Sequence, residues 1–493
     1  MDSNTSDGLF DESLLERVAP DATVIEAGAG IHKRFKAFDP DAVMMVPPSL
    51  DEWLPQTHLS RFIADIVEKE LDLSRFYAAY GKVKGQPPYD PRLMVRVLLY
   101  GYCVGVRSSR ELERACVDVV AFRWLAGQQA PDFRSIGRFR KRHLAALGNV
   151  FLQALELCRA AGMVSLGQVA LDGTKVRANA SRRKAMSYQR LTEKQKILAA
   201  EVSDLLADAD AIDKAEDARF GRDKRGDELP DELARRESRL VKLKAAREQL
   251  EADAAVKARK DAENKARERG DDDTVKAKGD DAANNAVVAP TAQRNFTDPD
   301  ARIMKTTDGS FHYAYNAQAV VDADHQVIVV TTLTNIGVDV EQVVPLVAKL
   351  QETVGVLPGQ VLADAGYCSN MNLEYAQTIE GESGGQAEFF IATGRQKHDD
   401  VLAEPDGALP ADASLRERMA RKLKTEAGKK AYARRKAIVE PVFGQIHTRQ
   451  GKYLLLRGLD HASHEWDLIA GAHNLLKLFS RRAEIALAAA AGT

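Results

Sequence analysis

Two short apolar segments, each of which runs into an aspartate, constrain the fold of this chain most. QVALDGTKV reaches Asp172 at the end of its apolar part, and QVLADAG reaches Asp364 in the same way. Short runs of aliphatic and β-branched residues bounded by glycine are typical of buried strands. The stretch between the two aspartates is long, and its first part is rich in charged residues. A fold that uses both acids must therefore bring together strands that are far apart in the sequence.

Part of the intervening stretch predicts helices. Residues 181–289 are dense in Ala, Lys, Arg, Asp and Glu, with nearly balanced charge. Pieces such as LTEKQKILAAEVSDLLADADAI carry apolar residues three and four positions apart, as an amphipathic helix does, whereas RGDDDTVKAKGDDAANNA, with its low hydrophobicity, predicts a loop or a disordered segment. We interpret 181–289 as a charged helical insertion between two strands of one fold. Two interpretations of the insertion stay open. It either contacts DNA or a second subunit, or it is a solvated helical hairpin that contributes little to function.

Residues 35–163 have a helical pattern, whereas residues 1–34 lack periodicity and are predicted to be a flexible extension. Asp90 is expected to cap a helix that Pro91 opens, and Ser109 is a candidate cap for the next helix. A later helix carries a run of basic residues: Arg134, Arg138, Arg140, Lys141 and Arg142. Such a region is either a helical DNA-binding domain or an all-α domain with a solvated basic face.

Strand character returns after the charged stretch. FHYAYNAQAVVDADHQVIVV predicts two strands joined by a turn, and a helix, the strand of Asp364, another helix, a strand and a helix with Glu440 follow. With the insertion omitted, this is the element order of an RNase H-like core. The first and fourth strands of that fold are parallel neighbours, so we expect Asp172 and Asp364 to lie side by side. The later helix can bring Glu440 beside them.

The predicted fold class is an α-helical N-terminal domain plus an α/β RNase H-like catalytic domain interrupted by a helical insertion. The catalytic domain would comprise residues 164–180 and 290–480, and residues 481–493 would form a tail.

Three clustered carboxylates predict a metal site. Carboxylates at one point repel each other, and their pKa values rise unless cations neutralise them. Mg²⁺ prefers oxygen ligands of this kind, and two ions about 4 Å apart can activate a water or a 3′-hydroxyl for phosphodiester chemistry. We therefore expect Asp172, Asp364 and Glu440 to bind two Mg²⁺ ions, with Mn²⁺ as a substitute.

Composition limits the other possibilities. The formal net charge is −2, so any attraction for nucleic acid must come from local basic segments. The four cysteines form no C-x-x-C or Cys/His cluster, which fits a reducing compartment rather than a disulfide or zinc framework. The N-terminus is acidic and polar, and no apolar run is long enough to span a bilayer. We expect a soluble cytoplasmic protein without a membrane partner.

The residues around the three acids resemble a known family. LDGTKVRANAS, LADAGYCS and IVEPVFGQIHTRQGKYLLLRG are similar to the three motifs of bacterial insertion-sequence DDE transposases, and the chain is identified as a member of their insertion-sequence-4/5-like group. PPYDPRLMVRVLLYGYCVGVRSSRELERA and PDFRSIGRFRKRH resemble the helical N-terminal domain of that family. The resemblance covers about Phe35 to Phe479, apart from the charged insertion.

The resemblance implies a function and a set of partners. The enzyme would cleave DNA at the ends of a mobile element by Mg²⁺-dependent hydrolysis, and the freed 3′-hydroxyl would then attack target DNA. Its partners would be the terminal inverted repeats of the element, the target DNA and further copies of the chain, as a homodimer or higher assembly. Two alternatives stay open, a non-catalytic DNA-binding regulator derived from a transposase and another RNase H-like nuclease.

The segment around Glu440 departs from the family pattern. Tyr432 and Arg435 each stand one position too near the N-terminus, and His447 replaces an expected lysine. On a continuous helix Lys436 and His447 share the face of Glu440, although Pro441 must start or kink a helix there. The residues predicted to contact phosphates are Arg435, Lys436, His447 and Arg449. An ordinary basic helix surface is the alternative.

Overall fold

The computed structural model describes residues 49–80, 87–220, 231–269, 271, 274–394, 409–410 and 412–491. The chain divides into two compact units, 1–55 and 56–493. In the first unit, helix α1 (Leu50–Trp53) is capped by Ser49, whose side-chain oxygen accepts a hydrogen bond from the Asp51 amide at 3.2 Å. The predicted flexible extension 1–34 lies outside the described residues. No helix in the described part of the chain is long and apolar enough to cross a membrane.

The second unit begins with a helical region, as predicted. Its helices are α2 (Leu59–Lys69), α3 (Ser74–Tyr77), α4 (Pro91–Val104), α5 (Ser109–Asp118), α6 (Val120–Leu125), α7 (Phe133–Arg142) and α8 (Leu144–Ala160). Asp90 caps α4 as predicted, because its carboxylate accepts a hydrogen bond from the Arg92 amide at 2.8 Å. The cap of α5 is Ser108 and not Ser109, because the Ser108 hydroxyl accepts from the Glu111 amide at 3.2 Å.

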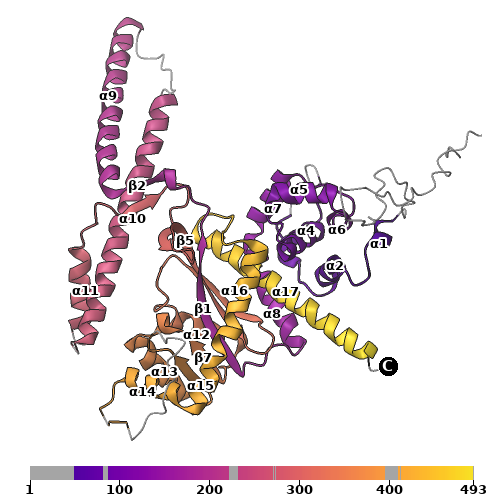
Figure 1. The fold of residues 1–493 in the computed structure, drawn as a ribbon. Helices are drawn as coiled ribbons and strands as arrows, with labels where there is room; N and C mark the ends of the chain where they lie inside the picture. Colours follow the sequence, from indigo (N-terminus) through magenta and orange to yellow (C-terminus); the bar gives the residue numbers. More distant parts are fainter. Residues whose placement is uncertain are drawn as a thin grey trace, which may run out of the picture. The chain divides into compact units, whose positions relative to one another are not determined.

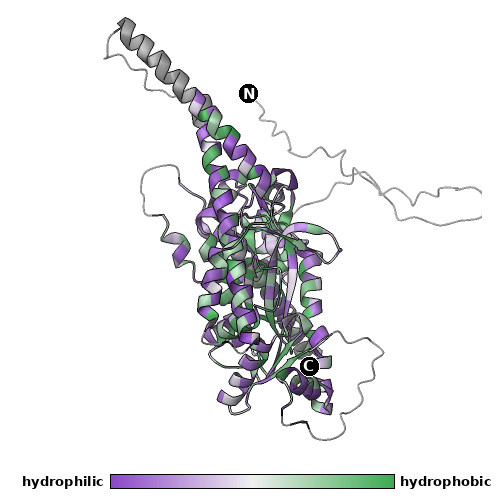
Figure 2. Ribbon diagram, turned by 90° about the vertical axis from the view of Figure 1, so that its left-hand side faces the viewer, coloured by the Kyte–Doolittle hydropathy of each residue, from purple (hydrophilic) through white to green (hydrophobic). Residues whose placement is uncertain are grey.

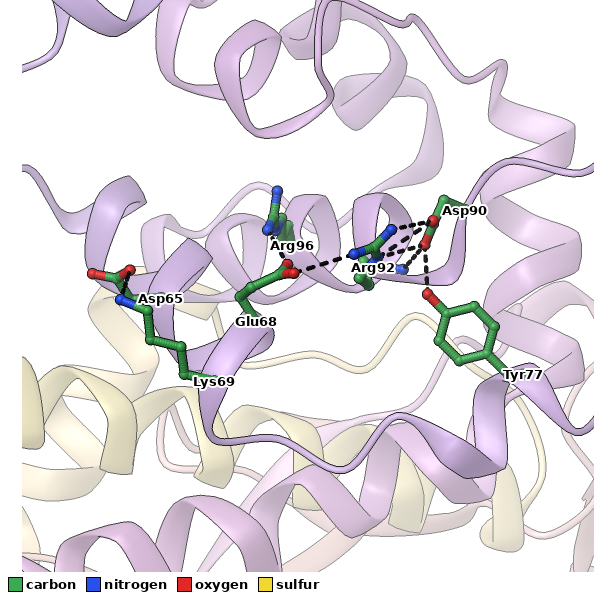
Figure 3. Close-up of polar contacts among 7 residues, drawn as sticks. All are labelled: Asp65, Glu68, Lys69, Tyr77, Asp90, Arg92 and Arg96. Carbon is green, nitrogen blue, oxygen red and sulfur yellow. Dashed lines mark hydrogen bonds and ion pairs between the residues drawn. The ribbon is translucent and has the colours of Figure 1, made fainter.

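A polar network ties α2, α3 and α4 together (Figure 3). The guanidinium of Arg92 lies 3.1 Å from one oxygen of Glu68, and that of Arg96 lies 2.5 Å from the other. The Tyr77 hydroxyl donates a hydrogen bond to the Asp90 carboxylate at 2.8 Å. These contacts fix the first turn of α4 against the two preceding helices.

The C-terminal half is built on a six-stranded mixed sheet. Its strands are β1 (Gln168–Arg177), β4 (Arg302–Lys305), β5 (Phe311–Asp322), β6 (Ile328–Thr334), β7 (Gln360–Ala363) and β8 (Glu388–Ile391). Strand β5 pairs antiparallel with β1 along one edge, and β4 and β6 pair antiparallel with successive parts of β5. Strands β1 and β7 are parallel neighbours, as predicted, and β8 runs parallel to β7.

Helices cover this sheet (Figure 1). They are α12 (Val343–Val354), α13 (Asn370–Glu382), α14 (Leu415–Lys424), α15 (Glu426–Ala433), α16 (Arg435–Gln450) and α17 (Leu459–Ala491). Helix α16 packs on β1 and β5, and α17 packs on β6 and on α8 of the N-terminal region. Hydrophobic residues gather where the strands run (Figure 2). Helix α17 continues to Ala491, whereas the sequence predicted a tail from residue 481.

Pro441 lies inside α16 without starting or ending it. Because proline has no amide hydrogen, the carbonyl of Ala437, four residues earlier, loses its helical hydrogen bond. The side-chain amide of Gln326 donates to this carbonyl at 3.0 Å. The helix therefore runs through the proline and carries Glu440 in its second turn.

Three helices, which we call the helical arm, occupy most of 181–289. They are α9 (Tyr188–Phe220), α10 (Asp231–Glu268) and α11 (Val275–Asn284). Helices α9 and α10 lie side by side (Figure 1), and a small core that includes Leu191, Leu243 and Leu250 is buried at their base. The short strands β2 (Ala185–Ser187) and β3 (Gln293–Asn295) pair antiparallel where the arm leaves and rejoins the chain.

The arm is attached to the sheet region by ion pairs, and it contains a helix that we predicted to be a loop. One oxygen of Asp253 on α10 lies 2.6 Å from the guanidinium of Arg294 and 2.7 Å from that of Arg302. The loop prediction for RGDDDTVKAKGDDAANNA is wrong for α11. That helix packs along α10, where Arg259 and Asp280 form an ion pair of 2.6 Å. Tertiary packing overrides low hydrophobicity at this point.

Candidate active site

Asp172 lies on β1, and Asp364 directly follows β7. The parallel register pairs Ala170 with Leu362. Asp172 lies two residues further along β1, which continues to Arg177, and Asp364 is the first residue after β7. Because parallel pairing keeps a constant offset, the two aspartates occupy matching positions two residues beyond this pair. Strands β1 and β7 and helix α16 are seen together in Figure 1. The sheet therefore brings together two acids that are distant in the sequence.

The Asp172 side chain is 20% exposed. Its Oδ1 accepts a hydrogen bond from the Gly173 amide at 2.8 Å, and its Oδ2 accepts one from Nη1 of Arg435 at 3.3 Å. Burial raises the pKa of Asp172 to about 6, the charge of Asp364 adds to the rise, and Arg435 opposes it. A side chain at Gly173 would overlap the amide group of Gln318, so any larger residue beside this acid would have to displace that buried amide.

The raised pKa of Asp172 predicts a pH effect on stability. The folded state holds the proton more tightly than the unfolded state, so the free energy of unfolding falls as the pH rises from about 4 to above 6. Asp172→Asn removes this titration. In metal-free protein, the free energy of unfolding of the variant relative to that of the parent should increase by up to roughly 3 kcal/mol as the pH rises from about 4 to about 8. Denaturant unfolding at both pH values measures the difference, and a difference that does not change with pH would contradict the assignment.

The Asp364 carboxylate caps a short 3-10 helix, η4 (Ala365–Tyr367), by accepting a hydrogen bond from the Gly366 amide at 2.8 Å. A Cβ built on Gly366 would lie 3.0 Å from Oδ1 of Asp364 and 3.7 Å from Oδ2 of Asp339. One carboxylate oxygen of Asp364 and one of Asp339 therefore lie within 4 Å of the same point. Asp339 is thus a fourth acid, close to Asp364.

Asp339 and the polar groups around it are not among the site residues that the sequence predicted. One oxygen of Asp339 accepts hydrogen bonds from Lys175 at 2.9 Å, Asn316 at 2.7 Å and Gln318 at 2.8 Å. The Tyr367 hydroxyl donates to the side-chain oxygen of Gln318. Asn316 and Gln318 are fully buried, and buried amides need partners. The available sequence signal was these two polar residues within the otherwise apolar stretch NAQAVV.

Arg435 links Glu440 to Asp172. The buried Arg435 side chain places Nη1 at 3.3 Å from Asp172 and Nη2 at 3.9 Å from Glu440. The Glu440 side chain is 56% exposed. Although Arg435 is one position away from the family spacing, the first turn of α16 directs it between the acid of β1 and the acid of α16.

The donor set suits a hard divalent cation in part. Asp172 and Asp364 offer carboxylate oxygens, the ligands such ions prefer. The pKa of Asp172 stays raised despite Arg435, so its negative charge is incompletely balanced. Among the described residues no three His, Cys, Asp or Glu side chains are gathered into one metal-binding group. Asp172 and Asp364 carry the kind of oxygen ligand that such an ion prefers, and Glu440 in this conformation does not complete a three-acid group.

The other basic residues predicted on α16 lie in different surroundings. Lys436 is exposed, one helical turn before Glu440. His447 lies 3.4 Å from the hydroxyl of Thr174 on β1, and burial lowers its pKa to about 4, so it is neutral near pH 7. Arg449 lines a separate cavity of about 510 Å³ together with Lys477. Of the four, Arg435 and Lys436 are nearest to Glu440.

Helix α7 displays four of its five predicted basic residues. Arg140 is buried and donates a hydrogen bond to the Arg107 carbonyl at 2.6 Å, which makes it part of the core. The exposed members are Arg134, Arg138, Lys141 and Arg142. They stand at positions i, i+4, i+7 and i+8, which share one helix face. None of the four forms an ion pair with a carboxylate of the described residues.

Comparison with protein families gives two matches. Residues 48–142 match a Transposase domain (DUF772), and residues 408–479 match a Transposase DDE domain. The first match includes helix α7, and the second includes α16 with Glu440. No curated protein and no solved structure matches the chain. A transposase domain thus matches the N-terminal helices and a transposase DDE domain matches the segment around α16, and together the two matches support a DNA transposase function.

Proposed function

We propose that Asp172, Asp364 and Glu440 are the catalytic, metal-binding carboxylates of this transposase. The observation that carries the proposal is the matching position of the two aspartates on the parallel strands β1 and β7. Arg435, which contacts both Asp172 and Glu440, supports the inclusion of Glu440. Acids on separate rigid elements suit this chemistry because each carboxylate is positioned independently.

We also propose that the catalytic half is an RNase H-like fold into which the helical arm is inserted. Three antiparallel strands, β6, β5 and β1, are followed by β7 and β8, which run parallel to β1. The arm follows β1 and ends before β4. Its position between these strands supports an insertion, and membership of the insertion-sequence-4/5-like group stays a prediction.

The proposed reaction is cleavage of DNA at the ends of the element followed by strand transfer. A water oxygen bonds to phosphorus as the bond to O3′ breaks, and the freed 3′-hydroxyl then bonds to a phosphorus of the target as the bond from that phosphorus to the target's O3′ breaks. Two Mg²⁺ ions, or Mn²⁺ in their place, would supply charge neutralisation and a more acidic attacking group. Arg435 orients Asp172 and Glu440, and the Asp339 network holds Gln318 and Tyr367 behind the acids.

We assign DNA contact to the exposed basic face of α7. Cations without acidic partners are available to phosphates, and each phosphate contact releases counterions. Lys141→Ala should weaken binding to duplex DNA several-fold and reduce the slope of log affinity against log salt by about 0.9. Anisotropy titrations over a range of salt concentrations measure both quantities. Lys194→Ala, an exposed lysine of α9, is the matched control, and an equal loss in the control would remove the special role of α7.

The test of the proposed function uses labelled DNA from the sequence that flanks the gene, which contains the terminal inverted repeats. Cleavage at the element boundary in Mg²⁺, with joined products when target DNA is added, supports it. Specific binding without cleavage in either Mg²⁺ or Mn²⁺ would favour the regulator. The mass of the protein–DNA complex tests the proposed homodimer or higher assembly.

A further inference from the structure

A second cavity, of about 880 Å³, lies in the helical region between the segment before α4 and helix α7. Tyr80, Tyr89 and Phe139 are among the residues of its wall, and Arg138, Lys141 and Arg142 are among those of its rim. We call it the tyrosine pocket. Its volume is within the range of pockets that bind small organic groups. It is formed by elements other than those that carry the three acids.

Two of the three aromatic residues are engaged with their neighbours. The ring of Phe139 is buried and stacks on Phe76, with 5.9 Å between ring centroids. The Tyr80 hydroxyl lies 3.2 Å from His143, and the guanidinium of Arg142 lies 5.3 Å from the centre of its ring. Tyr89 is half-buried and has no hydrogen bond or ring contact from its side chain within the described part of the chain. Tyr89 therefore lines the cavity without a side-chain partner among the described residues.

The backbone next to Tyr89 is held firmly. Asp90 accepts hydrogen bonds from the Arg92 amide and from the Tyr77 hydroxyl, each at 2.8 Å (Figure 3). Its carboxylate also pairs with the guanidinium of Arg92 at 2.9 Å, and these hydrogen bonds lower the pKa of Asp90 to about 2. Asp90 is thus ionised and fixed at any pH near neutrality. An aromatic residue beside such an anchor loses little backbone freedom when it binds.

The rim of the pocket is positively charged. Arg138, Lys141 and Arg142 are exposed and pair with no carboxylate in the described residues, and Arg138 has a hydrogen bond only to the Ser135 hydroxyl at 3.3 Å. The acid at the pocket is Asp132, whose carboxylate accepts from the amides of residues 134 and 135 as the cap of α7. Three cations therefore face solvent around an aromatic cavity. This charge is complementary to a nucleic acid backbone.

We propose that the tyrosine pocket binds one unpaired nucleotide of a DNA strand. The base would stack on Tyr89, and the flanking phosphates would contact Arg138, Lys141 and Arg142. In a duplex both faces of a base are covered by its neighbours, so an aromatic ring inside a cavity can stack only on a base that has left the helix. The inference rests on the proposed binding of element-end DNA and adds that the helical region recognises an unpaired position in it.

The experiment compares two labelled duplexes of element-end sequence that differ by one unpaired thymidine. At fixed salt the full-length parent should bind the duplex with the unpaired thymidine about tenfold more tightly than the fully paired duplex, because stacking of one base on an aromatic ring contributes about this much affinity. Tyr89→Ala should abolish this preference and leave affinity for the paired duplex unchanged, whereas Tyr89→Phe, which keeps the ring, should retain the preference. Far-ultraviolet circular dichroism of each variant reports folding. With 2-aminopurine at the unpaired position, stacking should quench its fluorescence in the parent and in Tyr89→Phe.

The outcomes separate this inference from the proposed function. Equal affinity of the parent for the two duplexes, or a preference that survives in Tyr89→Ala, overturns the tyrosine pocket and leaves DNA binding by α7 intact. A parent that binds neither duplex above a random sequence overturns both. A preference that Tyr89→Ala loses and Tyr89→Phe keeps, together with quenching, supports the pocket.

Discussion

Asp364→Asn is expected to reduce Mg²⁺-dependent cleavage of element-end DNA by about 10³-fold or more, because a metal-binding carboxylate contributes several kcal/mol to the stability of the transition state. Asparagine has almost the same shape, and its side-chain oxygen can still accept the hydrogen bond that Asp364 receives from the Gly366 amide at 2.8 Å. The fold and DNA affinity should therefore be preserved. Cleavage of labelled end DNA, measured beside a binding titration, separates the two effects.

The matched control is Asp261→Asn, which changes an exposed aspartate of α10 in the same way. It should cleave at the rate of the parent. An Asp364→Asn variant that cleaves within about tenfold of the parent, at equal affinity for DNA, would exclude Asp364 from the catalytic set. Loss of binding in that variant would instead indicate damage to the turn at η4.

Arg107→Met is expected to lower the free energy of unfolding by about 3–5 kcal/mol, the usual cost of removing one partner from a buried ion pair. Arg107, which follows α4, lies 3.2 Å from Glu465 of α17, and the two side chains are 2% and 0% exposed. Its guanidinium also donates to the carbonyls of Gln450 and Tyr453 and lies 4.7 Å from the centre of the Tyr453 ring. The substitution would leave Glu465 without its counter-charge between the helical region and the sheet region.

Two further variants define the origin of this effect. Arg123→Met removes an exposed arginine of α6 and should change stability by less than about 0.5 kcal/mol. Adding Glu465→Gln to Arg107→Met removes the second charge and should recover part of the loss, because replacing both partners is far less costly than replacing one. Denaturant unfolding measures all three proteins. A loss below about 1 kcal/mol in Arg107→Met would show that this ion pair does not stabilise the junction.

The elements near the candidate active site could be predicted because their signals are local. Asp172 and Asp364 end short apolar runs, and burial of such runs in a sheet requires only neighbouring residues of the right type. Asp90 and Pro91 predicted the start of α4, because the hydrogen bond from a helix cap also acts within one turn. The parallel neighbours β1 and β7 followed from the element order, and their register confirms that prediction.

The surroundings of the acids could not be predicted because they depend on residues far apart in the sequence. Asp339 accepts hydrogen bonds from Lys175, Asn316 and Gln318, and the longest of these links spans 164 residues. The continuity of α16 through Pro441 depends on Gln326, which donates to the carbonyl that the proline leaves unpaired. Periodicity and propensity carry no information about such partners.

Local sequence patterns indicated most of the helices and strands, the apolar segments that carry Asp172 and Asp364 and the basic character of α7, but not the extension of β1 beyond Asp172 to Arg177 or the helix α11. Which side chains those elements bury depended on tertiary contacts. Arg140 lies in the core although its neighbours on α7 are exposed, α11 is a helix because α10 packs beside it, and Arg435 is directed between Asp172 and Glu440. The physical reason is that local backbone preferences act over a few residues. Burial, and with it charge pairing and pKa, is set by whichever distant segments the fold brings into contact.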